Sequence, residues 1–207
     1  MPRPRSLTPA RIAEAALAVI DAEGLAALTM KAVAARLGMG TMSLYRYVAD
    51  RAELEELVVE RVLADVDTAT PDGPWRERVA VLAGRVRAAV ALHPNALPLT
   101  AAHRDGSPAL ARWSESVLEV LTGAGFAGED RVVALRALVA YLVGAIELEH
   151  RGPLEGRSTR RMAELTGFPL LAATARDALA LPPGAEFGRG LAALLDGLDG
   201  LAGSPPR

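Results

Sequence analysis

The sequence predicts an all-α fold, with an N-terminal three-helix helix-turn-helix domain followed by a larger helical domain. Alanine, leucine, valine and arginine supply much of the chain and aromatic residues only 4%, a balance that favours helices over strands. Glycine and proline fall between apolar segments whose residues recur at helical spacing, and no segment alternates as a strand does. With 51% hydrophobic residues, the 207-residue chain can bury a sizeable core.

Four helices are predicted in the first 68 residues. Thr8 and Pro9 are typical of an N-cap and a first helical residue, and Gly24 is expected to end this helix. Asp50 with Glu53 three residues later is an acidic capping signature. The second, third and fourth helices are therefore expected at 29–37, 41–48 and 50–68.

A linker-like stretch, TPDGP at residues 70–74, separates these helices from the rest of the chain. The domain border is expected at or just before this stretch. The three helices of the N-terminal domain, called the head here, are assigned to residues 8–54. The larger helical domain is assigned to residues 55–203. Further helices are expected at 75–92, 95–102, 107–122, 129–151, 158–179 with a break near 167–169, and 185–201.

Residues 132–148 are apolar on nearly every helical face except at Arg136. Such a helix either spans a membrane or is buried on two sides, and the short length and the internal arginine favour the second interpretation. The final helix carries an apolar stripe beside two glycines that permit close helix approach: Phe187, Leu191, Leu194, Leu195 and Leu198, with Gly188 and Gly190. We expect the helices at 129–151 and 185–201 to form a four-helix dimer interface.

Charge is distributed unevenly along the chain. The net charge is −2, yet residues 1–51 carry seven basic and four acidic residues, a net of +3, and the remainder carries −5. This suits contact with nucleic acid by one end only. The absence of cysteine excludes disulfides, thiolate metal sites and thiol nucleophiles, and no secretory signal is recognised, so a cytoplasmic protein is expected.

A helix-turn-helix motif is predicted in TMKAVAARLGMGTMSLYRYVAD, residues 29–50. Gly38 can adopt the positive φ that a tight turn between two helices requires. The residues expected to point inward are Val33, Leu37, Leu44 and Val48. Those left at the start and outer face of the second helix, which enters the major groove in such motifs, are Thr41, Met42, Ser43, Tyr45 and Tyr47.

The head resembles the TetR family of transcriptional regulators. The resemblance covers about residues 8–62 without a gap, and its segments are AALAVIDAEG (15–24), LT (28–29), VAARLG (33–38), SLYRYV (43–48) and the continuation with Asp50, Arg51, Glu53 and Leu54. It implies a homodimeric regulator of transcription that binds an inverted repeat in double-stranded DNA. Repression, relieved by a small-molecule effector, is the mode of action that the resemblance favours.

The resemblance also implies roles for individual residues. The residues placed at base edges or sugars are Thr41, Met42 and Ser43. Those placed at phosphates or close to the backbone are Thr29, Lys31, Tyr45, Tyr47 and Arg51. Arg46 departs from the family, which commonly has Tyr, Trp or His there, and it either reaches the DNA or only solvates the helix.

Structural roles compete with some of these assignments. Tyr45 is alternatively a core aromatic residue with its hydroxyl at the surface, and Thr29 is alternatively only an N-cap. Met42 is suited to a thymine methyl group or a sugar rather than to polar readout.

The larger domain resembles the C-terminal domains related to the tetracycline repressor more loosely, through HPNALPL (93–99), the helix near 107–125 and FGRGLAALLDGLDGL. The polar and aromatic residues expected to line a ligand cavity are His93, His103, Arg104, Trp113, Tyr141, Glu147 and His150. His93 is alternatively a helix C-terminal residue, and His103 with Arg104 alternatively a solvated loop. No metal-binding histidine can be mapped, so neither a tetracycline inducer nor a required cofactor is expected.

Two other functions are compatible with parts of the sequence. Glu147 and His150 have the spacing of a di-iron carboxylate motif, but the motif occurs once where such a bundle needs two copies, so we do not expect an enzyme. The second alternative is a transcriptional activator or a global DNA-binding regulator, which sequence alone does not distinguish from a repressor.

Overall fold

The computed structural model describes residues 7–103 and 106–201, the side chain of Ala101 excepted, and in these residues it contains helices and turns but no strand. The all-α prediction is confirmed. The chain divides into two compact units: Met1–Thr68 with Arg85–Glu115, called unit 1 here, and Ala69–Gly84 with Ser116–Arg207, called unit 2. Helices α5 (Trp75–Ala91) and α7 (Pro108–Gly123) each contribute residues to both units.

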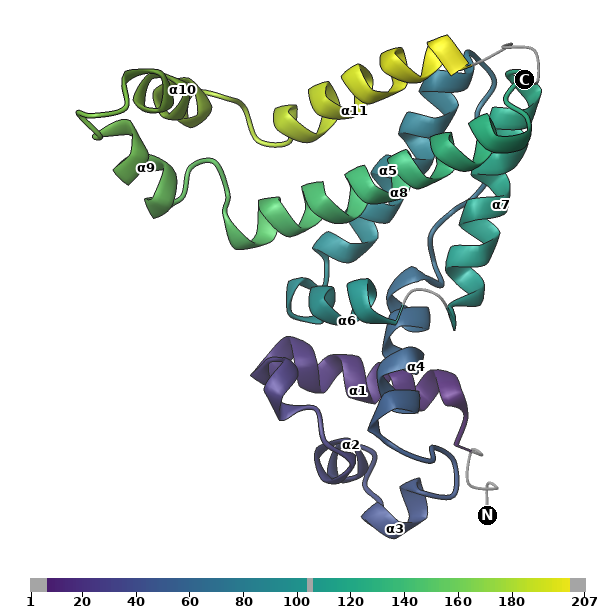
Figure 1. Cartoon of the computed structure of the whole chain (residues 1–207). Coiled ribbons are helices and arrows are strands. Elements are labelled where there is room, and N and C mark those ends of the chain that lie inside the picture. The colour runs from purple at the N-terminus through teal and green to yellow at the C-terminus, as the bar shows by residue number, and fades with distance from the viewer. Residues whose placement is uncertain (1–6, 104–105, 202–207) are drawn as a thin grey trace. The chain divides into compact units, whose positions relative to one another are not determined.

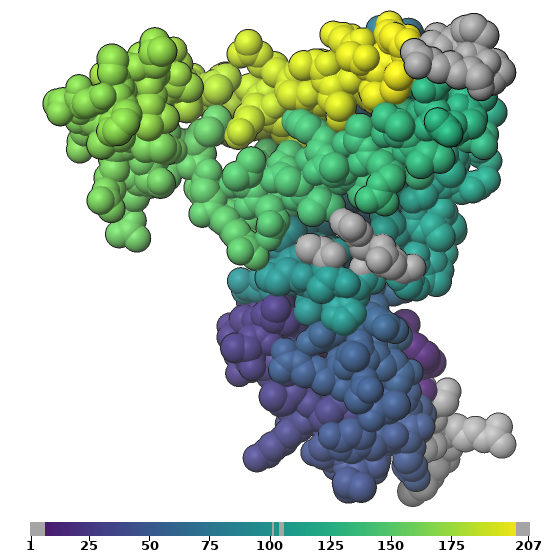
Figure 2. Space-filling view, viewed as in Figure 1, coloured from purple at the N-terminus to yellow at the C-terminus, as the bar shows by residue number. Residues whose placement is uncertain are grey.

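Unit 1 contains the predicted head and a second, later segment of the chain (Figure 1). Its elements, besides parts of α5 and α7, are α1 (Pro9–Glu23), η1 (Leu25–Ala27), α2 (Met30–Arg36), α3 (Thr41–Leu44), α4 (Arg51–Leu63), η2 (Pro94–Ala96) and α6 (Leu97–Ala102). The space-filling view shows the described residues of this head, drawn in purple to blue, lying against one another (Figure 2).

Helix α1 forms the centre of unit 1. It packs against α4, α2 and η2, and α4 in turn packs against α6. Ile12, Ala16 and Ile20 on α1 are fully buried, as are Leu54 and Val58 on α4. In Figure 1, α2 and α3 lie on one side of α1 and α6 lies on the other. The apolar contact between α1 and α4 therefore determines where the two helices of the predicted motif are held.

Capping residues set the bounds of these helices as predicted. Thr8 accepts a hydrogen bond from the Arg11 amide at 3.3 Å, Pro9 begins α1, and Gly24 ends it at a φ of 84°. Helix α4 ends at Leu63, earlier than the expected residue 68. The sequence that follows is rich in Asp and Thr, whose side chains compete for backbone hydrogen bonds and favour turns.

Unit 2 contains α8 (Gly128–Arg151), α9 (Arg157–Ala163), α10 (Pro169–Leu179), α11 (Ala185–Leu198) and η4 (Asp199–Leu201), with the remaining parts of α5 and α7. Helix α8 packs against α11, and α9 against α10. Between α9 and α10 the helix is interrupted where the sequence predicted a break. None of the described helices is both long and apolar enough to cross a membrane.

Contact between α8 and α11 depends on one aromatic residue. The Tyr141 hydroxyl donates to the Phe187 carbonyl at 2.6 Å, and the two rings lie 5.7 Å apart. Gly190 is the residue of α11 that the Tyr141 ring approaches, since a Cβ there would lie 2.5 Å from the hydroxyl oxygen and 3.1 Å from a ring carbon. A side chain larger than hydrogen at Gly190 would thus have to displace the ring.

We expect Gly190→Ala to be less stable than Gly188→Ala by about 1–3 kcal/mol, because only the first overpacks a contact. A Cβ at Gly188, also within α11, meets nothing within 4 Å. Gly188→Ala should therefore stabilise the chain by about 0.5–1 kcal/mol through helix propensity. Denaturant unfolding at one protein concentration measures both, and equal stabilities would contradict the packing described.

Candidate nucleic-acid interface

Helix α2 begins and ends with capping contacts that set its direction. Thr29 is the N-cap, its side chain accepting from the Ala32 amide at 3.1 Å. At the other end Gly38 has a φ of 69°, and the amides of Gly38 and Met39 donate to the carbonyls of Ala35 and Ala34. This pair of bonds is a Schellman motif, which requires a left-handed residue and explains the glycine.

Helix α3 presents one buried and one exposed face. Leu44 is fully buried, as is Val48 in the turn that follows. Met42 is 79% exposed, whereas Thr41 and Ser43 are partly exposed. Thr41 to Ser43 form the first turn of the second helix of the motif, which is the part that enters a groove of DNA in helix-turn-helix proteins.

The regular part of α3 ends at Leu44, although the sequence predicted a helix to Val48. Residues 45–47 form turns in which the Tyr47 amide bonds to the Leu44 carbonyl at 2.9 Å. Aromatic and β-branched residues have low helix propensity, so the tighter turn there costs little. Tyr45 and Tyr47 are each 45% exposed, which argues against Tyr45 as a core residue.

Side chains suited to phosphate surround this short helix. Thr29 and Lys31 occupy the start of α2, and Arg46 is exposed beside the two tyrosines. The cap bond uses one lone pair of the Thr29 hydroxyl and leaves its O–H free to donate, so capping and phosphate contact are compatible. The structure therefore assembles the predicted DNA-contact residues around α3 and the start of α2.

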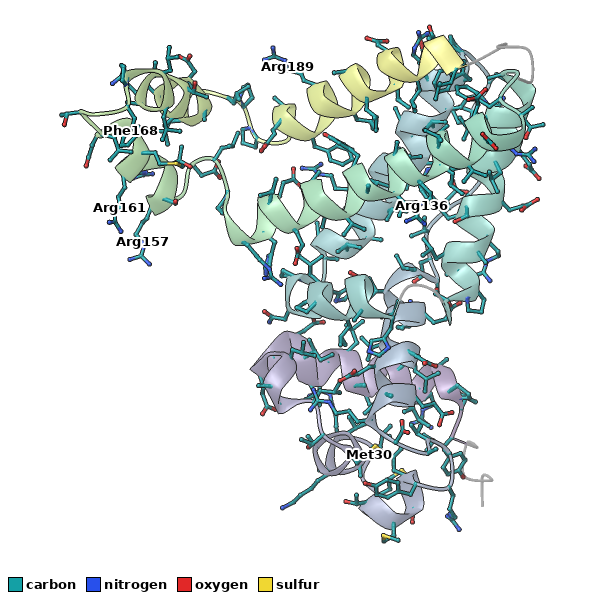
Figure 3. All side chains as sticks on the ribbon, in the orientation of Figure 1. Met30, Arg136, Arg157, Arg161, Phe168 and Arg189 are labelled. Carbon is teal, nitrogen blue, oxygen red and sulfur yellow. The ribbon has the colours of Figure 1, made fainter. Side chains whose placement is uncertain are left out.

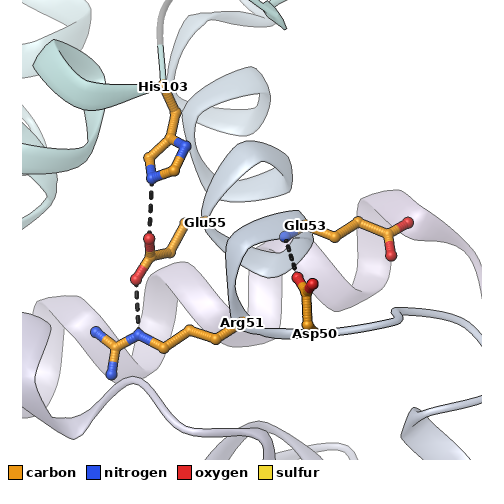
Figure 4. Close-up of polar contacts among 5 residues, drawn as sticks. All are labelled: Asp50, Arg51, Glu53, Glu55 and His103. Carbon is orange, nitrogen blue, oxygen red and sulfur yellow. Dashed lines mark hydrogen bonds and ion pairs between the residues drawn. The ribbon is translucent and has the colours of Figure 1, made fainter.

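The start of α4 adds a cation fixed by a carboxylate. Asp50 accepts from the Glu53 amide at 2.9 Å, and the Glu53 side chain accepts from the Ala49 amide at 2.6 Å, which confirms the predicted cap. Arg51 follows directly, and its Nε donates to Glu55 Oε1 at 2.7 Å. Figure 4 shows Glu55 between Arg51 and His103, with one carboxylate oxygen directed to each.

The first two histidines predicted for a ligand cavity pair with carboxylates in unit 1. His93 Nδ1 lies 2.9 Å from Asp21 on α1, beside Asn95, which donates to the Ile20 carbonyl at 3.3 Å. His103 Nε2 lies 2.9 Å from Glu55 on α4. The two histidines thus contact different helices of the head, and their role toward a ligand stays a prediction.

The other predicted ligand residues are buried, contact other residues of the chain or are exposed on α8. Trp113 is 1% exposed within the core, and Tyr141 is bound to Phe187. Glu147 forms an ion pair with Arg151 at 2.8 Å, and His150 is exposed further along α8. Arg104 lies outside the described residues.

An open pocket of ≈560 Å³ lies along α9, where sequence reasoning predicted no site. Its lining residues are Arg157, Ser158, Arg161, Met162 and Leu165. Figure 3 shows Arg157 and Arg161 projecting from α9. No ligand candidate lines it, and in the described part of the chain no three His, Asp or Glu residues are grouped to hold a metal ion.

Glu60 on α4 contributes contacts that the sequence gave no reason to expect. One of its oxygens accepts from the Ser107 hydroxyl at 2.6 Å and from the Ala109 amide at 2.9 Å, at the start of α7. Arg112 lies 3.6 Å from the other oxygen. Through Glu55 and Glu60, α4 contacts both His103 and Ser107.

The sequence could have predicted the Arg51–Glu55 ion pair, because the two residues have i, i+4 spacing on one helix. The Glu60–Ser107 contact joins residues 47 positions apart, so no local sequence pattern indicates it.

Comparison with known proteins identifies the family of the chain. Residues 12–57 match a family model described as bacterial regulatory proteins of the tetR family, and residues 68–201 match the tetracyclin repressor-like C-terminal domain. The chain belongs to the TetR family. Members of this family are DNA-binding regulators of transcription rather than enzymes, and the predicted resemblance is confirmed for both parts of the chain.

Individual TetR-family proteins match over nearly the whole chain. The transcriptional repressor DrrR1 of Streptomyces coeruleorubidus is 33% identical, covering 96% of this chain and 79% of that protein. The class A tetracycline repressor from transposon 1721 of Escherichia coli is 29% identical, covering 93% and 90%. The crystal structure of ActR from Streptomyces coelicolor in complex with actinorhodin has a TM-score of 0.83 at 27% identity, covering 97% and 100%.

We expect Glu60→Ala to lower the free energy of unfolding by about 1–2 kcal/mol, because it leaves the buried Ser107 hydroxyl and an amide at the start of α7 without their acceptor. Glu56→Ala is the matched control, since Glu56 is exposed on the same helix, and it should change stability by about 0.5 kcal/mol or less. Equal losses in the two variants, measured by chemical denaturation, would contradict a role for Glu60 in fixing α7.

Proposed function

We propose that this TetR-family chain is a transcriptional repressor that occupies an operator as a dimer and leaves it on binding a small molecule. The observation that carries the proposal is the first turn of α3, in which short polar side chains and Met42 are presented from a helix anchored by Leu44. An exposed methionine beside tyrosines and cations contributes little to the packing of the core, but it suits contact with a groove of DNA.

We propose two classes of DNA contact for the exposed and partly exposed residues around α3. Thr41, Met42 and Ser43 would read base edges or sugars. The proposed phosphate contacts are Thr29, Lys31, Tyr45, Arg46, Tyr47 and Arg51. We assign these contacts to a DNA-binding domain of residues 8–54, working in the cytoplasm where the DNA lies, and ligand binding and dimerisation to residues 55–203.

For the dimer, we propose α8 and α11 as the contact between two copies, on an inverted-repeat operator. The predicted α11 stripe is occupied within the chain itself, because Phe187, Leu191 and Leu195 are buried in unit 2. The face left for a partner combines small residues, which allow close helix approach, with the larger Val132 and Arg136 of α8. Its exposed members include Ala140, Gly144 and Leu148 on α8 and Ala193 and Gly197 on α11.

For the effector, the relatives suggest a class of ligand rather than a compound. ActR has been crystallised with actinorhodin, so a protein of this fold and of similar sequence holds an organic small molecule. We propose that an organic molecule of comparable kind binds within residues 55–203 of this chain. If the protein retains this molecule through purification, mass spectrometry of the purified protein would identify it.

The two classes of DNA contact should respond differently to substitution. Tyr47→Ala and Arg51→Ala should weaken binding to every operator variant by a similar factor, since phosphate contacts carry no sequence information. Arg51→Ala should also flatten the salt dependence of binding, because it removes a cation. Thr41→Ala and Ser43→Ala should instead change which sequences a random duplex library yields after selection. Titration and selection test this, and unchanged affinity in both phosphate variants would refute the assignment.

Dimerisation should fail when a charge is placed on the proposed partner face. We expect Ala140→Glu to raise the dimer dissociation constant at least ~100-fold, because a carboxylate from each copy would be buried in the contact. Ala111→Glu, which adds the same charge at an exposed position of α7, should leave the dimer intact. Sedimentation equilibrium measures both, and a dimeric Ala140→Glu protein would place the interface elsewhere.

A further inference from the structure

We infer that Glu55 is a positioning residue for DNA binding, which holds the Arg51 guanidinium for a phosphate and links it to His103. The inference rests on the proposed function, because it takes Arg51 as a phosphate contact. It adds a carboxylate, which repels phosphate, to the residues on which operator affinity depends.

The geometry divides the two carboxylate oxygens between two partners. Oε1 accepts from Arg51 Nε at 2.7 Å, and Oε2 lies 2.9 Å from His103 Nε2 (Figure 4). An ionised carboxylate only accepts, so the His103 nitrogen that faces it carries the proton and donates. Each oxygen therefore has its own donor, and the Glu55 side chain is held from both sides.

The three side chains differ in burial as a positioning role for Glu55 requires. The side chain of Glu55 is 15% exposed and that of His103 23%, whereas that of Arg51 is 50% exposed. The carboxylate is thus the shielded, fixed part and the guanidinium the accessible part. Since only the Nε–H is engaged, the two Nη groups keep four N–H donors for phosphate oxygens.

A positioning role for Glu55 and a purely electrostatic role predict opposite changes in DNA affinity when the carboxylate is neutralised. A nearby negative charge repels DNA, so its neutralisation alone would tighten binding. A carboxylate that holds a flexible arginine in place removes part of the ordering cost of binding, so its loss would weaken binding. The sign of the change in affinity therefore separates the two.

The test uses the full-length protein and a duplex that the wild-type protein selects from a random library. We expect Glu55→Gln to weaken binding to this duplex about threefold to tenfold. Glu56→Gln, which removes the same charge from the next residue of α4, should leave affinity unchanged or raise it slightly. Unchanged or tighter binding by Glu55→Gln would overturn the inference.

A second pair of variants separates positioning from a general effect on the fold. Arg51→Gln should itself weaken binding, and adding Glu55→Gln to it should change affinity less than about twofold. His103→Ala should weaken binding about threefold in the wild-type background and have no effect beside Glu55→Gln. If Glu55→Gln weakens binding equally in the Arg51→Gln background, its effect is structural and the inference fails.

Failure of the proposed function gives a different result. If the wild-type protein selects no sequence from the library, the operator-binding role itself is wrong, and the role of Glu55 is rejected with it. If the wild-type protein selects a sequence but Arg51→Gln binds it with full affinity, operator binding stands and the positioning of Arg51 by Glu55 is rejected.

Discussion

The apolar packing of α1 against α4 is the constraint on which the rest of unit 1 depends. Ile12, Ala16 and Ile20 on one helix and Leu54 and Val58 on the other are fully buried, so α4 is held along the length of α1. Helix α2 packs on the same α1, and α3 is fastened to α2 by the Gly38 turn and by buried Leu44. The four-residue helix that carries the proposed DNA-contact side chains is therefore held by the packing of its neighbours rather than by its own length.

Helix α4 combines this structural role with a chemical one. Its buried face packs on α1, its first residue is a proposed phosphate contact, and two of its four carboxylates, those of Glu55 and Glu60, bind His103 and Ser107. The same helix therefore contacts His103 and Ser107 and also carries a proposed phosphate contact.

The sequence was informative wherever structure depends on neighbours in the chain. Thr8, Thr29 and Asp50 cap helices, and Gly38 adopts its positive φ, because these choices are made by local backbone chemistry. Contacts across long separations left no such signal. His93 lies 2.9 Å from Asp21, 72 residues earlier, and this pairing could not be predicted without knowing that η2 packs on α1.

We propose that two copies of this chain read an inverted repeat through the first turn of α3, and hydroxyl-radical footprinting of the wild-type protein on its selected duplex is the most direct test. We expect two symmetry-related protected regions whose centres lie about one helical turn, ~10 base pairs, or a small multiple of it apart. A single protected region, or protection without two-fold symmetry, would contradict it.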